Sequence, residues 1–138
     1  MVVDIIDNYS GTNAANLANY YAGVAYLNTG KYQEAIEYLD QFKADDANVA
    51  PIAKGAIGDA FAQLDQKEDA LKYYENAAAM SSSELTAPRF LLKAGITAID
   101  LGKPTIALKH LNAIVDEYPK SPEATKATLY LGKAEAMK

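Results

Sequence analysis

The amino-acid sequence predicts an all-α fold, in which antiparallel helix hairpins stack into an α-solenoid of about three full repeats. Three observations support this prediction. A glycine recurs at intervals of 35, 37 and 37 residues, at Gly23, Gly58, Gly95 and Gly132. Each of the first three glycines is followed at near-constant spacings by a turn former, an alanine and a bulky residue. No segment alternates polar and apolar residues as a half-buried strand does.

The spacings within each unit indicate a helix, a tight turn and a second helix. The turn formers, seven residues beyond each glycine, are Gly30, Asp65 and Gly102. Twelve residues beyond stand Ala35, Ala70 and Ala107, and sixteen beyond stand Leu39, Tyr74 and Leu111. Helices that cross closely need a small residue at the crossing point. We therefore expect Gly23 on the first helix to face Ala35 on the second, backbone close to backbone.

Apolar residues at positions i, i+3, i+4 and i+7 define the individual helices. They predict, in order, helices over residues 12–29, 31–44, 48–64, 67–80, 87–101, 103–117 and 122–138. Three prolines fall within predicted first turns, where a missing amide hydrogen costs little: Pro51, Pro88 and Pro104. Ser121 precedes Pro122 and Glu123, which predicts a capping hydroxyl, a first-position proline and a carboxylate that suits the helix dipole.

Composition and charge exclude several classes of function. The 138 residues include no cysteine and one histidine, so a disulfide framework, a thiolate nucleophile and a multi-histidine metal centre are excluded. Thirteen basic against eighteen acidic residues give a net charge of −5, which phosphate backbones and anionic lipids repel. Nucleic acid is therefore not an expected partner. The uncharged stretch 8–30 is long enough to span a bilayer, but its asparagines and hydroxyls make insertion costly, which favours a soluble chain.

The sequence offers no catalytic or metal-binding constellation, so we expect neither an enzyme nor a cofactor. His110 lies beside Lys109 on a predicted second helix, where a solvated surface histidine is expected rather than a general base. Asp45 and Asp46 stand at a helix junction, where capping explains them without calcium. No glycine-rich phosphate loop occurs, because the glycines are spread at repeat spacing.

The register resembles the tetratricopeptide repeat (TPR), a helix-turn-helix unit of about 34 residues. The residues that carry the resemblance are Gly23, Tyr26, Gly30, Tyr32, Ala35, Ile36, Gly58, Phe61, Ala70, Leu71, Tyr74, Gly95, Gly102, Ala107, Leu108 and Pro119. Asn19, Lys54 and Leu91 stand where the consensus has tryptophan, and Pro104 replaces the aromatic that Tyr32 supplies. The resemblance implies a right-handed superhelix whose first helices line a concave groove.

The register divides the chain, a single domain over 1–138, into five parts. Residues 1–11 are expected to be the tail of an upstream helix, because 5–9 align with 114–118. Three repeats follow over 12–47, 48–84 and 85–120, and 121–138 is expected to be a capping helix. The run 4–42 and the link 118–122 are similar to bacterial cell-envelope TPR proteins, including membrane-anchored ancillary chaperones of the translocon. That similarity implies the periplasmic face of the inner membrane, reached through an anchor that is missing here, with the cytoplasm as the alternative.

The resemblance also implies which side chains face the groove. These candidate partner-binding residues are Tyr20, Val24, Leu27, Asn28, Asp59, Gln63, Arg89, Leu92, Ile96 and Ile99. The groove is then mainly apolar, which suits an amphipathic helix or an extended apolar peptide. Val24, Leu27, Ile96 and Ile99 could equally be packing between helices. TPRs that clamp a terminal carboxylate use Lys and Asn where this chain has Tyr20 and Val24, so that activity is not implied.

Two functional hypotheses follow. The first is a non-catalytic protein-interaction module, chaperone-like or an assembly factor, that binds a peptide or helix of a partner in the groove. The alternative is a structural scaffold that dimerises through its exposed first helix, since burying apolar surface contributes about 25 cal/mol per Å².

Overall fold

The computed structural model describes residues 13–44 and 49–138, and within them the chain forms seven α-helices and no strand. The helices are α2 (Asn13–Asn28), α3 (Tyr32–Gln41), α4 (Val49–Gln63), α5 (Lys67–Met80), α6 (Ala87–Asp100), α7 (Pro104–Glu117) and α8 (Pro122–Ala136). They confirm the predicted all-α class, and the helix bounds follow the predicted ranges closely. The expected upstream tail, 1–11, lies outside the described residues.

The largest difference in bounds is at α3, which ends at Gln41 although the periodicity predicts helix up to residue 44. Phe42 is extended, with φ −71° and ψ 129°. The side chain of Asn16 on α2 then binds both backbone groups of Lys43. The Asn16 amide donates to the Lys43 carbonyl at 2.7 Å, and the Lys43 amide donates to Asn16 Oδ1 at 2.8 Å. This tertiary contact holds the backbone away from helical geometry, which the local pattern does not reveal.

The turns within the hairpins confirm the predicted turn formers. Gly30, Asp65 and Gly102 all have positive φ, at 81°, 59° and 71°. Glycine enters this left-handed region freely, and aspartate tolerates it better than most residues. The three equivalent positions therefore reverse the chain in the same way.

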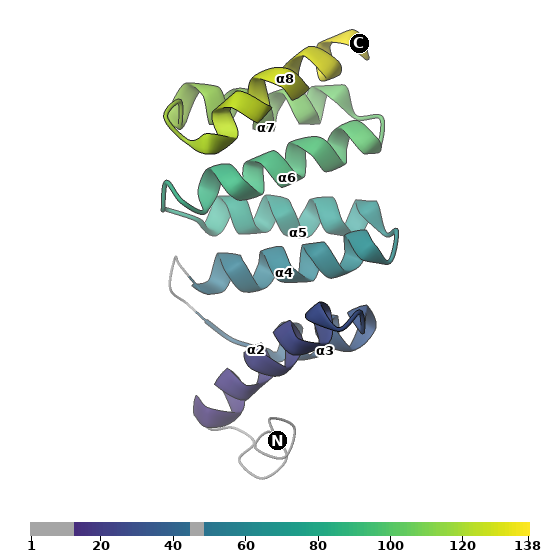
Figure 1. Ribbon diagram of the computed structural model, residues 1–138, viewed down its shortest axis with the longest axis vertical. Coiled ribbons are helices and arrows are strands. Elements are labelled where there is room, and N and C mark those ends of the chain that lie inside the picture. Colours follow the sequence, from purple (N-terminus) through teal and green to yellow (C-terminus); the bar gives the residue numbers. More distant parts are fainter. Residues whose placement is uncertain (1–12, 45–48) are drawn as a thin grey trace.

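The helices stack in chain order, as Figure 1 shows, with α2 near one end of the molecule and α8 at the other. Each helix packs on the next, and α8 also packs on α6. Alanines form much of the core, and those with no exposed surface are Ala35, Ala60, Ala70, Ala77, Ala94, Ala98, Ala107, Ala127 and Ala134. Such small side chains let neighbouring helices pack closely, so the stack is a continuous solenoid.

The first three recurring glycines have equivalent surroundings, but not the ones predicted, and Gly132 has no such neighbour. A Cβ added at Gly58 would lie 2.8 Å from the Tyr74 ring, and one at Gly95 would lie 2.7 Å from Leu111 Cδ2. At Gly23 the nearest atoms likewise belong to Leu39 rather than to Ala35. Gly23, Gly58 and Gly95 are therefore each a socket for the large side chain sixteen residues later. The predicted contact between Gly23 and Ala35 is wrong, because Leu39 lies against this glycine instead.

The start of α8 confirms the predicted proline at the first helical position but not the capping hydroxyl. Ser121 is extended, with φ −72° and ψ 151°, yet its side chain makes no capping hydrogen bond. Instead, Ser121 Oγ donates to the carbonyl of Tyr118 at 2.8 Å. Among the described helices, none is long and apolar enough to cross a membrane.

Candidate functional site

A hollow of about 350 Å³ opens beside the first helices of three successive repeats. Its lining residues are Leu27 on α2, Tyr32 on α3, Asp59, Ala62 and Gln63 on α4, Tyr74 on α5 and Lys93 on α6. Apolar side chains from the first repeat therefore meet polar side chains from the second and third. We call this surface the hollow.

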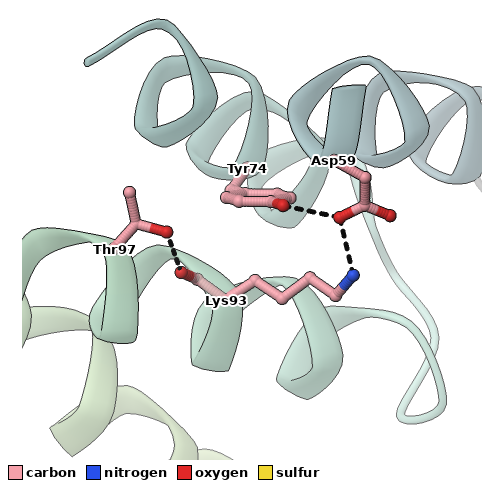
Figure 2. A network of polar contacts seen from close by, with 4 residues as sticks. All are labelled: Asp59, Tyr74, Lys93 and Thr97. Atoms are coloured by element: carbon pink, nitrogen blue, oxygen red, sulfur yellow. Dashed lines mark hydrogen bonds and ion pairs between the residues drawn. The ribbon is translucent and has the colours of Figure 1, made fainter. Parts of the chain in front are cut away.

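Asp59 is the centre of a polar network that joins three helices at the hollow (Figure 2). The Tyr74 hydroxyl donates to Asp59 Oδ1 at 2.5 Å, and the Lys93 ammonium donates to the same oxygen at 2.7 Å. The side chains of Asp59 and Lys93 are 32% and 33% exposed, so water still reaches this ion pair. The network connects the second repeat to the third from within the hollow.

Burial fixes the protonation state of Tyr74. Only 4% of this residue is exposed. Burial first, and then the hydrogen bond to Asp59, raise the pKa of Tyr74 far above the ordinary value of 10.0. The hydroxyl therefore remains a hydrogen-bond donor at neutral pH, and the Lys93 ammonium lies 5.6 Å from the centre of the same ring.

The network leaves hydrogen-bonding capacity toward the hollow. Both contacts use Asp59 Oδ1, and within the described residues Oδ2 accepts no hydrogen bond. The exposed amide of Gln63 lies on the same helix, one turn further on. A carboxylate oxygen and an amide beside an apolar patch can bind backbone groups and an apolar side chain of a peptide.

The residues that line the hollow include one carboxylate and no histidine, so they form no group of metal ligands. In 13–44 and 49–138, no three histidine, cysteine or acidic residues gather closely enough to hold a metal ion.

The structure brings together three of the predicted groove residues, Leu27, Asp59 and Gln63. The others lie outside the hollow. Tyr20 is half-buried, with its ring centre 5.1 Å from that of Phe42, so it packs between α2 and the end of α3.

The remaining predicted residues differ in how much surface they offer. Asn28 and Arg89 are exposed, and Val24, Ile96 and Ile99 are half-buried. Leu92 is only 9% exposed and belongs to the core, so it packs against other helices and offers little surface to a partner. The structure thus places Leu92 between helices, where the sequence predicts a groove residue.

Sequence reasoning missed Tyr74 and Lys93 as polar members of this site, although for Tyr74 the register contains a signal. The position after the repeat glycine is Val24, Asp59 and Ile96, and the position sixteen beyond the glycine is Leu39, Tyr74 and Leu111. Both positions change from apolar to polar in the second repeat alone. A paired change of this kind indicates a side-chain hydrogen bond between the two helices.

His110 is not the solvated histidine that the sequence predicts. It is only 8% exposed, and its Nε2 lies 2.6 Å from Glu75 Oε2 across α5 and α7. His110 follows Ala107 by three residues and precedes Ile114 by four, so it lies on the buried face of its helix. The hydrogen bond to Glu75 satisfies a polar group that packing takes out of water.

The exposed surface of α2, on which the dimerisation hypothesis rests, includes large apolar side chains. Leu17 and Tyr21 are 50% and 55% exposed. Self-association through this helix stays a prediction.

Comparisons with known proteins identify a matching family model and a similar solved structure. The model of a family described as tetratricopeptide repeat matches residues 6–50, 22–84 and 92–138. No curated protein sequence matches the chain. Among solved structures, the crystal structure of PcrH in complex with the chaperone binding region of PopB is similar, with a TM-score of 0.65 and 19% sequence identity. That alignment covers 94% of this chain and 98% of the PcrH chain, and at this identity it shows a shared fold.

Proposed function

Because this chain belongs to the tetratricopeptide-repeat family, we propose that it is a non-catalytic interaction module that binds a peptide segment of a partner protein in the hollow. The observation that carries the proposal is the composition of the hollow, in which Leu27, the Tyr32 ring and Ala62 lie beside a larger polar surface whose hydrogen-bonding groups have unused capacity. Sites of this composition orient a ligand through a few polar contacts and gain affinity from apolar burial.

The residues of the hollow have separate roles in this proposal. Leu27 and Tyr32 receive an apolar side chain of the peptide. Asp59 Oδ2 and the Gln63 amide bind its backbone or a polar side chain. Lys93 fixes the carboxylate of Asp59 at 2.7 Å, so that the acceptor is already oriented before the ligand arrives.

The solved neighbour supports the choice of ligand. PcrH has the same fold over nearly its whole length, and its structure contains a bound region of another protein, PopB. A peptide is therefore a ligand class that this architecture accommodates. We also propose a chaperone-like or assembly role for this chain, and the PcrH complex supports that role.

The resemblance of residues 4–42 to envelope TPR proteins supports a location at the periplasmic face of a bacterial inner membrane. Protease digestion of spheroplasts that express the protein from its native gene tests this location. Degradation from outside supports it, and protection contradicts it.

Selection of peptides from a random display library on the full chain tests the proposed function. The affinities of the selected peptides are then measured by fluorescence anisotropy with Gln63→Arg and Leu27→Asp. Gln63 is exposed, so its substitution preserves the fold, which circular dichroism checks. We expect each variant to bind at least tenfold more weakly, because one inserts a bulky cation and the other places a charge in the apolar patch.

Asn112→Arg is the matched control, because Asn112 is an exposed residue on α7 that does not line the hollow. We expect it to bind within twofold of the parent chain. Equal affinity of all three variants would show that the peptide binds elsewhere, and the proposal would then be wrong.

A further inference from the structure

The ion pair of Asp59 and Lys93 presents an unused acceptor and unused donors close together in the hollow. Asp59 uses only Oδ1, which accepts from Tyr74 at 2.5 Å and from Lys93 at 2.7 Å. Of the three hydrogens on Lys93 Nζ, the described residues bind one. Figure 2 shows the second oxygen of Asp59 directed away from the Tyr74 hydroxyl. Because Oδ2 and Oδ1 share one carbon, the free acceptor lies close to the free donors.

The charges that line the hollow cancel, and this determines the class of side chain that fits the pair. Among the described residues that line it, Asp59 is the one acid and Lys93 is the one base. A carboxylate of a ligand at this point is repelled by Asp59, and an ammonium is repelled by Lys93. The two side chains are about one-third exposed, so a ligand can reach them. A neutral group that donates and accepts at once is therefore the best complement.

The carboxamide of asparagine or glutamine is such a group. Its oxygen and one N–H lie on the same edge of a planar amide, the edge that these side chains use when they bind adenine with two hydrogen bonds. In the hollow the N–H would donate to Asp59 Oδ2, and the oxygen would accept from Lys93 Nζ. A backbone peptide group cannot make both bonds, because it is trans and its N–H and C=O point in opposite directions.

We propose that the Asp59–Lys93 pair selects peptides that carry asparagine or glutamine at one position. This inference rests on the proposed function, because it names the side chain that the hollow recognises. Tyr74 holds the carboxylate of Asp59 from the side opposite the ligand. Leu27 and Tyr32 then receive an apolar neighbour of the selected residue.

Parallel selection from one random peptide display library tests this specificity. The library is panned on the parent chain, on Lys93→Met and on Asp59→Asn, and the selected pools are sequenced. We expect asparagine and glutamine to be enriched at least threefold over the input at one aligned position of the parent pool. Lys93→Met leaves Asp59 without its cation, so its pool should carry lysine or arginine there. Asp59→Asn leaves Lys93 without its anion and should select aspartate or glutamate.

Lys72→Met is the matched control, because Lys72 is exposed on α5 and does not line the hollow. Its pool should have the composition of the parent pool, and circular dichroism checks that each variant is folded. A purely structural role of the ion pair would leave the composition of the pools unchanged. Equal composition of the parent and Lys93→Met pools overturns the inference, and so does a parent pool that is rich in charged residues at this position.

Leu27→Asp separates this inference from the proposed function. Selected peptides that bind this variant at least tenfold more weakly, yet show no preference for a carboxamide, refute the inference and leave the proposed function in place. Peptides that bind Leu27→Asp as tightly as the parent chain contradict both. A library from which the parent chain selects no peptide also contradicts both.

Discussion

Replacing the repeat glycines by alanine should have opposite effects on stability at two equivalent positions. Gly95→Ala places a methyl group 2.7 Å from Leu111 Cδ2 and 2.8 Å from its Cγ, whereas carbon atoms pack best at about 3.5–4.0 Å. Leu111 has no exposed surface and cannot move aside freely. Gly132→Ala adds the same methyl group where no atom lies within 4 Å.

The size of each effect follows from two opposing contributions. In a helix, alanine is more favourable than glycine by about 1 kcal/mol, and this stabilising contribution is present in both variants. Overpacking a tight core costs about 1–3 kcal/mol, and only Gly95→Ala pays it. We expect Gly132→Ala to be stabilised by about 0.5–1 kcal/mol and Gly95→Ala to be destabilised by up to about 2 kcal/mol. For a chain of this length, 1 kcal/mol shifts Tm by roughly 3–4 °C.

Thermal melting followed by circular dichroism, together with urea titration, measures both changes. A combined Gly95→Ala and Leu111→Ala variant provides the internal check. Leu111→Ala alone is expected to cost about 2–5 kcal/mol, and the added methyl group should recover part of that loss. A Gly95→Ala variant that melts above the parent, or a Gly132→Ala variant that melts below it, would refute the socket interpretation.

Three further predictions concern the polar contacts. Tyr74→Phe is expected to cost about 0.5–1.5 kcal/mol at neutral pH, because Asp59 loses a donor. The raised pKa of Tyr74 means that its contribution is complete below pH about 10 and declines as pH rises further. Urea midpoints at pH 9–11 should therefore fall faster for the parent than for Tyr74→Phe, and parallel curves would contradict this. Glu75→Ala should cost about 1–3 kcal/mol in urea unfolding because it leaves buried His110 without its partner, and an unchanged midpoint would count against that role. Lys93→Met should cost less than about 1 kcal/mol and reduce the salt dependence of stability, since the ion pair is about one-third exposed; an unchanged salt dependence would be the contrary result.

The arrangement of helices could be predicted because it depends on local patterns. Apolar spacing defines a helix within its own sequence, and the positive φ at Asp65 follows from its place between two such patterns. The end of α3 could not be predicted in this way. It depends on Asn16, 27 residues away in sequence, which binds the backbone of Lys43 in both directions.

The candidate site was only partly predictable for a related reason. Leu27, Asp59 and Gln63 face the hollow as the repeat register implies. The Asp59–Lys93 pair depends on the relative rotation of two helices in different repeats, which no local spacing encodes. His110 was predicted wrongly because the charged neighbour Lys109 was given more weight than the spacing of His110 from the buried positions of α7.

The rim of the hollow is shared among three consecutive repeats, and this has a mechanical consequence. When the solenoid bends elastically, the distance between Leu27 in the first repeat and Lys93 in the third repeat changes. A bound peptide that contacts both of these residues resists the bending and therefore stiffens the solenoid between the first and third repeats. Occupancy is then readable as slower amide exchange throughout α2 and α3, including the turns of these helices that lie away from Leu27 and Tyr32.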